Sequence, residues 1–471
     1  MLIKIATNEK PLNLSSAVLI SIFFGLIVLQ YDFKAVALLG LFAFLFVYCA
    51  KTEYAFYFLL ASRSIIDIYV GFEAVGAITP TQIIGIFIAS LFLLYFIFSG
   101  YHIFHLGINK VFGIFLFLSI SSIFSTQNLI SGFGSWLKLL QGFLFLNMSI
   151  LLILSVKDGL YKKRMNTICW SIIVAVLLPY ALFLKNYLQG SHTEIGGYAR
   201  YSADFGSYPN LFSYYLLPVF PICLFFYSIS VERSKKIFWI LFMVMLLFAI
   251  YKSYTRNVWM AIAVMLLTWN VVRKNFKVII LFVSIAALMV FFSSEVQDRF
   301  KDIALILQSR SFFDLEPTLL SSRIGIWQSN LNYFFHKTSF MEKLFGSGFD
   351  VKYSVLSLSS DLSHSIEEHN NYLSLLMNTG ICGLFVYCLY IVMLFRESLK
   401  LLRKTNDIYL KNLAQISISF VVTYAVVCFF THMMWKINFQ YYFSSFLGIV
   451  VAANFLSEKK GIEMFASKKI C

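Results

Sequence analysis

The sequence predicts an all-α polytopic membrane protein, and three observations carry this prediction. Hydrophobic residues make up 59% of the 471 residues and charged residues 13%, whereas soluble globular proteins have about 45–50% apolar and about 25% charged residues. The mean hydropathy is +0.78. Apolar runs recur along the chain without the alternation typical of membrane strands, so each run is expected to cross the membrane as a helix.

About fourteen apolar runs are the expected spans. Several are shorter than the ~20 residues that cross a bilayer as helix, so we predict 12–14 transmembrane helices. The run at 54–71 is the most ambiguous because it carries Arg63 and Asp67 on one helical face. The runs lie near 15–31, 35–50, 54–71, 82–99, 111–125, 135–155, 166–184, 209–229, 237–251, 257–272, 277–293, 369–395, 413–431 and 437–456.

The first run is interpreted as a helix that stays in the protein. Lys4 and Lys10 precede it, as basic residues precede a signal peptide, but the run is long for a signal-peptide core and lacks a convincing cleavage site. With the N-terminus inside and the spans alternating, every dense basic cluster falls on one side. These clusters lie within 157–164, 233–236, 273–277, 396–411 and 459–469.

The distribution of basic residues predicts the orientation. Lys and Arg concentrate in cytoplasmic loops of membrane proteins, so both termini are expected in the cytoplasm. The net charge of +15 is spread over these short loops rather than gathered in one patch, which argues against a nucleic-acid partner and leaves membrane lipids as the surroundings.

The same alternation places a large, partly helical loop outside the cytoplasm. It divides the chain into transmembrane helices 1–11 (1–293), the loop (294–368), and C-terminal transmembrane helices with a cytoplasmic tail (369–471). Within the loop we expect amphipathic helices at 295–310 and 321–335, and a turn at Gly346-Ser347-Gly348. Long ordered loops usually carry function.

His369 follows Glu367 and Glu368 where this loop meets the apolar run 369–395. That run would be about 40 Å long as a helix, more than the ~30 Å hydrocarbon core, so its outer end is expected to protrude. An imidazole titrates near neutrality and can accept a proton there. A purely structural polar role is the plainer alternative. Asn370 is a weaker site candidate that fits a helix cap equally well, and His336 and His364 compete for the role of base.

Three arginines are candidate anion ligands. Arg200 precedes the span at 209–229, Arg256 lies in a very short external turn with Lys252 one helical turn before it, and Arg323 lies in the loop. Each has a plainer interpretation, either as a snorkelling side chain or as the polar face of a helix. A guanidinium suits a diphosphate because its planar fork donates two parallel hydrogen bonds.

Lys138 and Lys252 are weaker candidates for the same anion site. No Asp-rich motif is expected outside the membrane, and the seven cysteines show no CxxC or Cys/His metal spacing. The sequence therefore predicts no metal, no cofactor and no disulfide.

These motifs together resemble the O-antigen ligase and O-antigen polymerase superfamily of bacterial membrane glycosyltransferases. His369-Asn370 with Gly380 and Gly383 resembles the histidine motif that follows the family's large periplasmic loop. Thr255-Arg256 resembles the arginine of its short periplasmic turn. Two further matches are Ser322-Arg323 with Ile326-Trp327, and Tyr198-Ala199-Arg200 with Pro209-Asn210. The resemblance covers about 195–395.

The resemblance implies a GT-C-like fold and a metal-independent, inverting glycosyltransferase in the bacterial inner membrane with a periplasmic active site. A glycan would pass from undecaprenyl diphosphate to an acceptor hydroxyl, with His369 as base and Arg200, Arg256 and Arg323 on the diphosphate. The acceptor would be lipid A-core in a ligase or another lipid-linked glycan in a polymerase, and the sequence leaves both open. A transporter or flippase is less favoured because the candidate charges collect at helix ends rather than mid-span.

Overall fold

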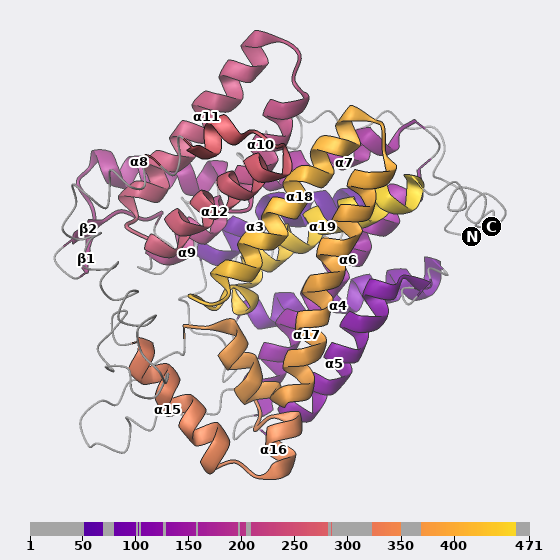
Figure 1. Ribbon diagram of the computed structural model, residues 1–471, viewed down its shortest axis with the longest axis vertical. Helices are drawn as coiled ribbons and strands as arrows, with labels where there is room; N and C mark the ends of the chain where they lie inside the picture. Colours follow the sequence, from indigo (N-terminus) through magenta and orange to yellow (C-terminus); the bar gives the residue numbers. More distant parts are fainter. Residues whose placement is uncertain are drawn as a thin grey trace.

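The computed structural model describes residues 51–68, 80–99, 102, 105–125, 129–156, 159–195, 198–203, 209–280, 284, 323–349 and 369–457 (Figure 1). The expected spans at 15–31 and 35–50, most of the one at 277–293, and the loop helix expected at 295–310 lie outside these residues. The uncleaved first helix therefore stays a prediction.

All the other expected spans are helical, which confirms the all-α membrane architecture. Within the described ranges, eight helical segments are long and apolar enough to cross a membrane, and two more apolar helices are shorter. The helices are α3 (Thr52–Ile68), α4 (Pro80–Ser99), α5 (Gly107–Phe124), α6 (Leu129–Leu154), α7 (Tyr161–Ala175), α8 (Leu177–Leu188), α9 (Pro209–Leu216), α10 (Val219–Ile229), α11 (Arg233–Lys252), α12 (Arg256–Val272), α17 (Asn371–Lys404), α18 (Ile408–Val427) and α19 (Ile437–Ser457).

The centre of the bundle is formed by α19, which packs along α6 and also meets α3, α7, α17 and α18. The rings of Phe145 and Tyr441 stack with centroids 3.7 Å apart. Gly448 brings the two backbones close, because an added Cβ would lie 2.5 Å from the Leu146 carbonyl oxygen. Small residues at such crossings allow close van der Waals packing, which holds membrane helices together where lipid is as apolar as the helices.

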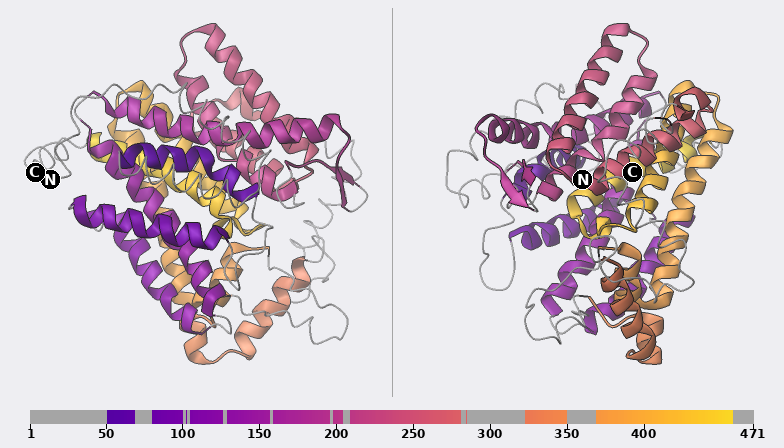
Figure 2. Two further views of the ribbon diagram at one scale, coloured as in Figure 1. Left: turned by 180° about the vertical axis from the view of Figure 1, so that it is seen from behind. Right: turned by 60° about the vertical axis from the view of Figure 1, so that its left-hand side comes forward.

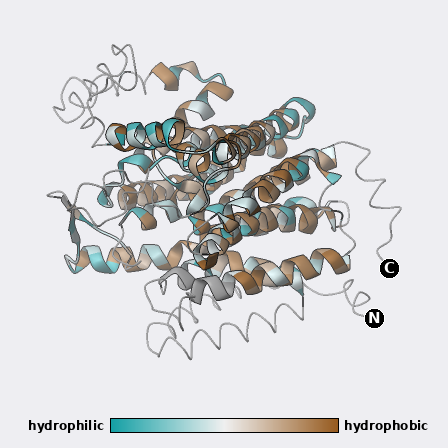
Figure 3. Ribbon diagram, turned by 90° about the horizontal axis from the view of Figure 1, so that it is seen from below, coloured by the Kyte–Doolittle hydropathy of each residue, from teal (hydrophilic) through white to brown (hydrophobic). Residues whose placement is uncertain are grey.

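One short β-hairpin interrupts the helical pattern. Strands β1 (Thr193–Ile195) and β2 (Tyr198–Arg200) pair antiparallel, with Thr193 opposite Arg200. Nothing in the sequence predicts this hairpin, since two three-residue strands are too short to show alternation. Figure 3 shows hydrophilic residues on this hairpin, whereas the surrounding helices are mostly hydrophobic.

The described part of the loop expected at 294–368 contains α15 (Arg323–His336) and α16 (Phe340–Phe345). The first confirms the helix expected at 321–335. Both pack against α17, and Figure 2 shows them together at one end of the bundle. Helix α16 begins with a capping box between Ser339 and Glu342 and ends at Phe345, with Gly346 as its C-cap. The chain bends over 346–348, where a turn was expected, with positive φ angles at Gly346 and Gly348.

Helix α17 differs from the single straight helix that the apolar run 369–395 suggested. It breaks at Gly380, whose backbone has φ 70° and ψ −173°, a region open essentially to glycine alone. A short first segment, Asn371 to Thr379, thereby meets the long remainder at an angle (Figure 1). The carbonyls released at the break are satisfied from outside the helix: Ser347 N donates to Met377 O at 2.9 Å, and the Ser122 hydroxyl donates to Asn378 O at 2.7 Å.

Candidate active site

The turn between α11 and α12 presents Arg256 as the first residue of α12. Tyr254 adopts a left-handed backbone with φ 51°, which reverses the chain within three residues. A buried hydroxyl cluster fixes the turn to α9: the Ser213 and Thr255 hydroxyl oxygens are 3.1 Å apart, and Thr255 donates to Asn210 Oδ1 at 3.1 Å. The predicted very short turn is confirmed.

The β-hairpin brings Arg200 to this turn. Tyr201 N donates to the Lys252 carbonyl at 3.1 Å, and Asn186 Nδ2 donates to Ser202 O at 2.9 Å. These two bonds tie the end of β2 to α11 and to α8. The structure therefore joins Arg200 and Arg256, which are 56 positions apart in the sequence.

The two guanidinium groups lie close enough to influence each other. Burial and the positive charge of Arg256 both lower the pKa of Arg200, although an arginine in a protein stays charged. The Nε of Arg200 is buried and has no hydrogen-bond acceptor among the described residues. A buried donor without an acceptor costs about 1–3 kcal/mol, so this position suits an anion.

Lys252 adds a third cation beside the pair. Its ammonium lies 5.4 Å from the ring centroid of Tyr187 and 5.8 Å from that of Tyr251. Cation–π contacts of this kind hold an ammonium in place without neutralising its charge. Three of the seven predicted site residues thus share one positively charged corner at the ends of α11, α12 and β2.

The connection between α18 and α19 links this corner to the histidine motif. Asn257 Nδ2 donates to the Phe430 carbonyl at 3.0 Å, and the Tyr214 hydroxyl and Thr431 Oγ1 are 2.8 Å apart. On its other side, the connection accepts a 2.8 Å hydrogen bond from Asn371 N at the Cys428 carbonyl. A continuous set of contacts therefore runs from Arg256 to the start of α17.

His369 lies directly before the N-cap residue of α17, where the loop meets the helix. Its backbone is left-handed, with φ 48°, a conformation in which His is enriched. Asn370 caps the helix, because its Oδ1 accepts from Tyr372 N and Leu373 N at 2.9 and 3.0 Å. The cap explains Asn370 structurally, whereas nothing in the helix geometry requires an imidazole before it.

His432 was missed by the sequence analysis. Its ring stacks on that of His369, with centroids 5.9 Å apart and planes 24° apart, and only 7% of the residue is exposed. It precedes a short 3₁₀ helix, η4 (Met433–Trp435). The available signal was a short turn carrying His432 and Lys436 between the last two expected spans, which the predicted topology places on the same side as Arg256.

The two remaining candidates lie on other helices. Arg323 begins α15, which packs against the first segment of α17 through Phe334, Leu373 and Met377. This packing puts α15 beside the histidine motif. Lys138 lies well inside α6. Among the described residues there is no group of three or more potential metal ligands.

A comparison with protein families identifies the segment that carries these motifs. Residues 219–388 match the O-antigen ligase family. This match confirms the resemblance to the O-antigen ligase and polymerase superfamily and supports a glycosyltransferase-type enzyme. The matched segment contains Arg256, Arg323 and His369, whereas Arg200 precedes it. A comparison with curated proteins returns no match.

Proposed function

We propose that this protein transfers a glycan from undecaprenyl diphosphate to an acceptor hydroxyl at the periplasmic face of the bacterial inner membrane, as an O-antigen ligase with lipid A-core as acceptor. The observation that carries the proposal is the corner of Arg200 and Arg256, joined through residues 428–432 to His369. The family match supports the reaction class.

The arginine corner is the proposed site of the donor diphosphate. Two guanidinium groups repel each other, and the buried Nε of Arg200 lacks an acceptor among the described residues. A diphosphate would relieve both effects, since its oxygens accept hydrogen bonds and its negative charge offsets the repulsion. As the sugar–phosphate bond breaks, fixed cations stabilise the charge that develops on the departing lipid diphosphate.

His369 is the proposed general base. The acceptor oxygen would attack the anomeric carbon, the bond from that carbon to the diphosphate would break, and the hydroxyl proton would pass to the imidazole. A single displacement of this kind inverts the anomeric configuration. His432 packs against the His369 ring and would hold it in one orientation, as a base must be held to reach its proton.

Arg323 is proposed as a third diphosphate contact, delivered by α15 from the loop side. The polymerase alternative keeps this chemistry and changes only the acceptor to a second lipid-linked glycan. The acceptor preference of the purified enzyme therefore separates the two roles.

The test measures transfer by purified protein from undecaprenyl-diphosphate glycan to lipid A-core and, separately, to a lipid-linked glycan. Metal is omitted and a chelator is added. We expect His369→Ala to lower turnover by about 10²–10⁴-fold while donor binding is retained. His336→Ala, which changes an exposed histidine at the end of α15, is the matched control and should transfer normally.

Three outcomes would count against the proposal. Near-wild-type turnover by His369→Ala removes the base assignment. Loss of all activity with chelator removes the metal-independent diphosphate site. Transfer to the lipid-linked glycan alone replaces the ligase role with that of a polymerase.

A further inference from the structure

A second candidate site lies at the opposite end of α18 from His369. A cavity of ≈550 Å³ opens between the start of α7, the end of α10 and the starts of α11 and α18. It is lined by Lys162, Asn166, Ser228, Ile229, Ser230, Val231, Lys236, Ile408 and Tyr409. Its volume lies within the range of about 300–1,000 Å³ that is usual for ligand sites, and the proposed transfer reaction does not use it.

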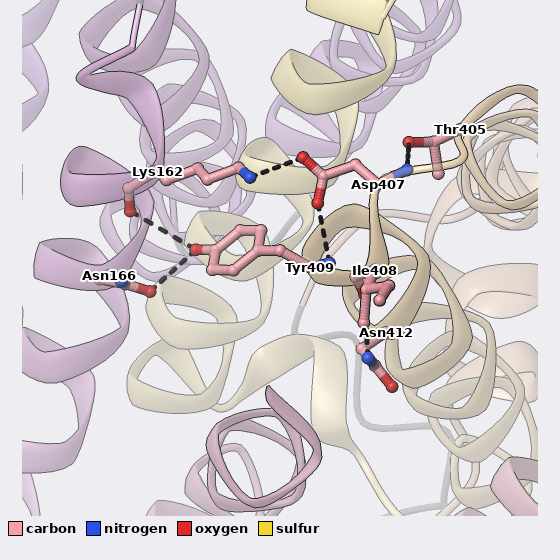
Figure 4. Close-up of polar contacts among 7 residues, drawn as sticks. All are labelled: Lys162, Asn166, Thr405, Asp407, Ile408, Tyr409 and Asn412. Atoms are coloured by element: carbon pink, nitrogen blue, oxygen red, sulfur yellow. Dashed lines mark hydrogen bonds and ion pairs between the residues drawn. The ribbon is translucent and has the colours of Figure 1, made fainter. Parts of the chain in front are cut away.

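One wall of the cavity is held by an ion pair and an aromatic ring (Figure 4). Lys162 Nζ lies 2.6 Å from the Asp407 carboxylate and 5.3 Å from the centre of the Tyr409 ring. The Tyr409 hydroxyl donates to Asn166 Oδ1 at 2.8 Å. These contacts fix the wall before any ligand binds, and Asp407 balances the charge of Lys162.

The opposite wall supplies positive charge that is not balanced within the described residues. Lys236 lines the cavity and forms no ion pair with any described carboxylate, whereas its neighbour Lys235 is paired with Glu232 at 2.6 Å. Helices α7, α11 and α18 all begin here, so three helix N-termini add partial positive charge. The cavity therefore favours an anionic group.

The mouth of the cavity is apolar rather than polar. Val231 is 93% exposed and Ile408 is 73% exposed. The protein has helices that are long and apolar enough to cross a membrane, so lipid is available to cover these side chains. Exposed aliphatic side chains beside a cationic cavity match a ligand with an anionic head and hydrocarbon chains. A free inorganic anion has no hydrocarbon chain that could pack against Val231 and Ile408.

We infer that this cavity binds the phosphate headgroup of an anionic phospholipid, with its acyl chains against Val231 and Ile408. The Lys236 ammonium pairs with the phosphate, and Lys162 and the Asn166 amide provide further donors. Basic pockets between transmembrane helices on the cytoplasmic side bind anionic headgroups in this way. On the predicted topology this end of α18 is cytoplasmic, so the lipid is one of the inner leaflet and is not a substrate.

Native mass spectrometry of the full-length protein in detergent tests the inference, with phosphatidylglycerol and phosphatidylcholine of equal chain length as probes. We expect the wild type to bind phosphatidylglycerol in preference. Lys236→Gln should weaken phosphatidylglycerol binding about fivefold, as expected for one lysine near a lipid surface, and leave phosphatidylcholine binding unchanged. Lys236→Arg should restore the preference because it restores the charge.

Lys235→Gln is the matched control, since it removes a neighbouring charge that does not line the cavity. The inference is overturned if Lys235→Gln weakens phosphatidylglycerol binding as much as Lys236→Gln. Equal binding of the two lipids by the wild type would also overturn it. Displacement of the lipid by inorganic phosphate in excess would assign the cavity to a soluble phosphate instead.

Discussion

Arg256 occupies a position where a cation is unfavourable. It is the first residue of α12, and the N-terminus of a helix already carries about half a positive charge. Arg200 and Lys252 add to the positive charge of the same corner. Proteins keep such arrangements where function needs them. An anion bound at this corner would be attracted by the helix N-terminus and by each of the three cations.

The arginine geometry leads to a prediction about charge-conserving substitution. Arg256→Lys should strongly lower glycan transfer, because an ammonium cannot reproduce the bidentate fork of a guanidinium. Arg273→Lys is the control: Arg273 caps the other end of the same helix, where it lies 4.8 Å from the Trp269 ring. Transfer rates of purified variants at matched expression provide the measurement. Wild-type rates for both Arg256→Lys and Arg256→Ala would remove this residue from the site.

Sequence reasoning pointed to individual candidate residues better than it pointed to their neighbours in the fold. Arg200, Arg256 and His369 each stand out in the sequence, because a charge or an imidazole lies at an apolar boundary that the predicted topology places outside the cytoplasm. His432 does not stand out in the sequence, since one histidine in a turn between two spans is ordinary. Its significance comes from the ring of His369 beside it, a long-range contact that no local pattern predicts.

Two glycines form the contact between α16 and α17. Gly346 has φ 85° and ψ 167°, and Gly380 has φ 70° and ψ −173°; both conformations are essentially restricted to glycine. A Cβ on Gly346 would lie 2.1 Å from the Asn378 carbonyl oxygen, and one on Gly380 would lie 2.3 Å from that of Leu344. Each glycine therefore makes room for the backbone beside the other.

We predict that Gly380→Ala destabilises the protein. The backbone conformation alone costs on the order of 1–3 kcal/mol for a residue with a side chain, and the close carbonyl adds to this. Gly142→Ala is the control, because its Cβ would meet its nearest neighbour at 3.5 Å inside a helix, where Ala is preferred to Gly by about 1 kcal/mol. Thermal unfolding in detergent should show a lower transition temperature for the first variant only. An unchanged transition for Gly380→Ala would show that the break does not require glycine.

Hydrophobic runs predicted the existence of the helices well, because burial in lipid dictates their composition. The runs did not predict where one run divides into two helices. The run 166–184 divides into α7 and α8, and 209–229 into α9 and α10, with Pro179 and Pro218 at or near the two breaks. At Gly380 the freed carbonyls are satisfied by other parts of the chain, Ser347 and Ser122.

The arrangement of the described residues agrees with the sidedness expected from the charges of the sequence. The arginine corner, His369, α15 and α16 belong to one side of the helices, while the Lys162 and Lys236 cavity belongs to the other. Orientation itself stays a prediction from the positive-inside pattern.

Labelling of intact cells with a membrane-impermeant thiol reagent tests the orientation. Met341→Cys, on the exposed surface of α16, should be labelled above the wild-type background. Lys404→Cys, at the far end of α17, should be labelled only after the membrane is opened. The reverse pattern would invert the topology and place the proposed active site in the cytoplasm.

Because α17 breaks at Gly380, its first segment is a short helix, and His369 lies directly before the N-cap of that segment. This segment is held by residues outside its own helix. Phe334 of α15 packs against it, the Cys428 carbonyl accepts a hydrogen bond from Asn371 N, and the Trp435 indole donates to the Ser374 hydroxyl at 3.2 Å. We expect a tilt of the long portion of α17, as occurs when bilayer thickness changes, to be taken up at Gly380. The distance between the imidazole and the arginine corner would then stay constant as the thickness of the surrounding lipid varies.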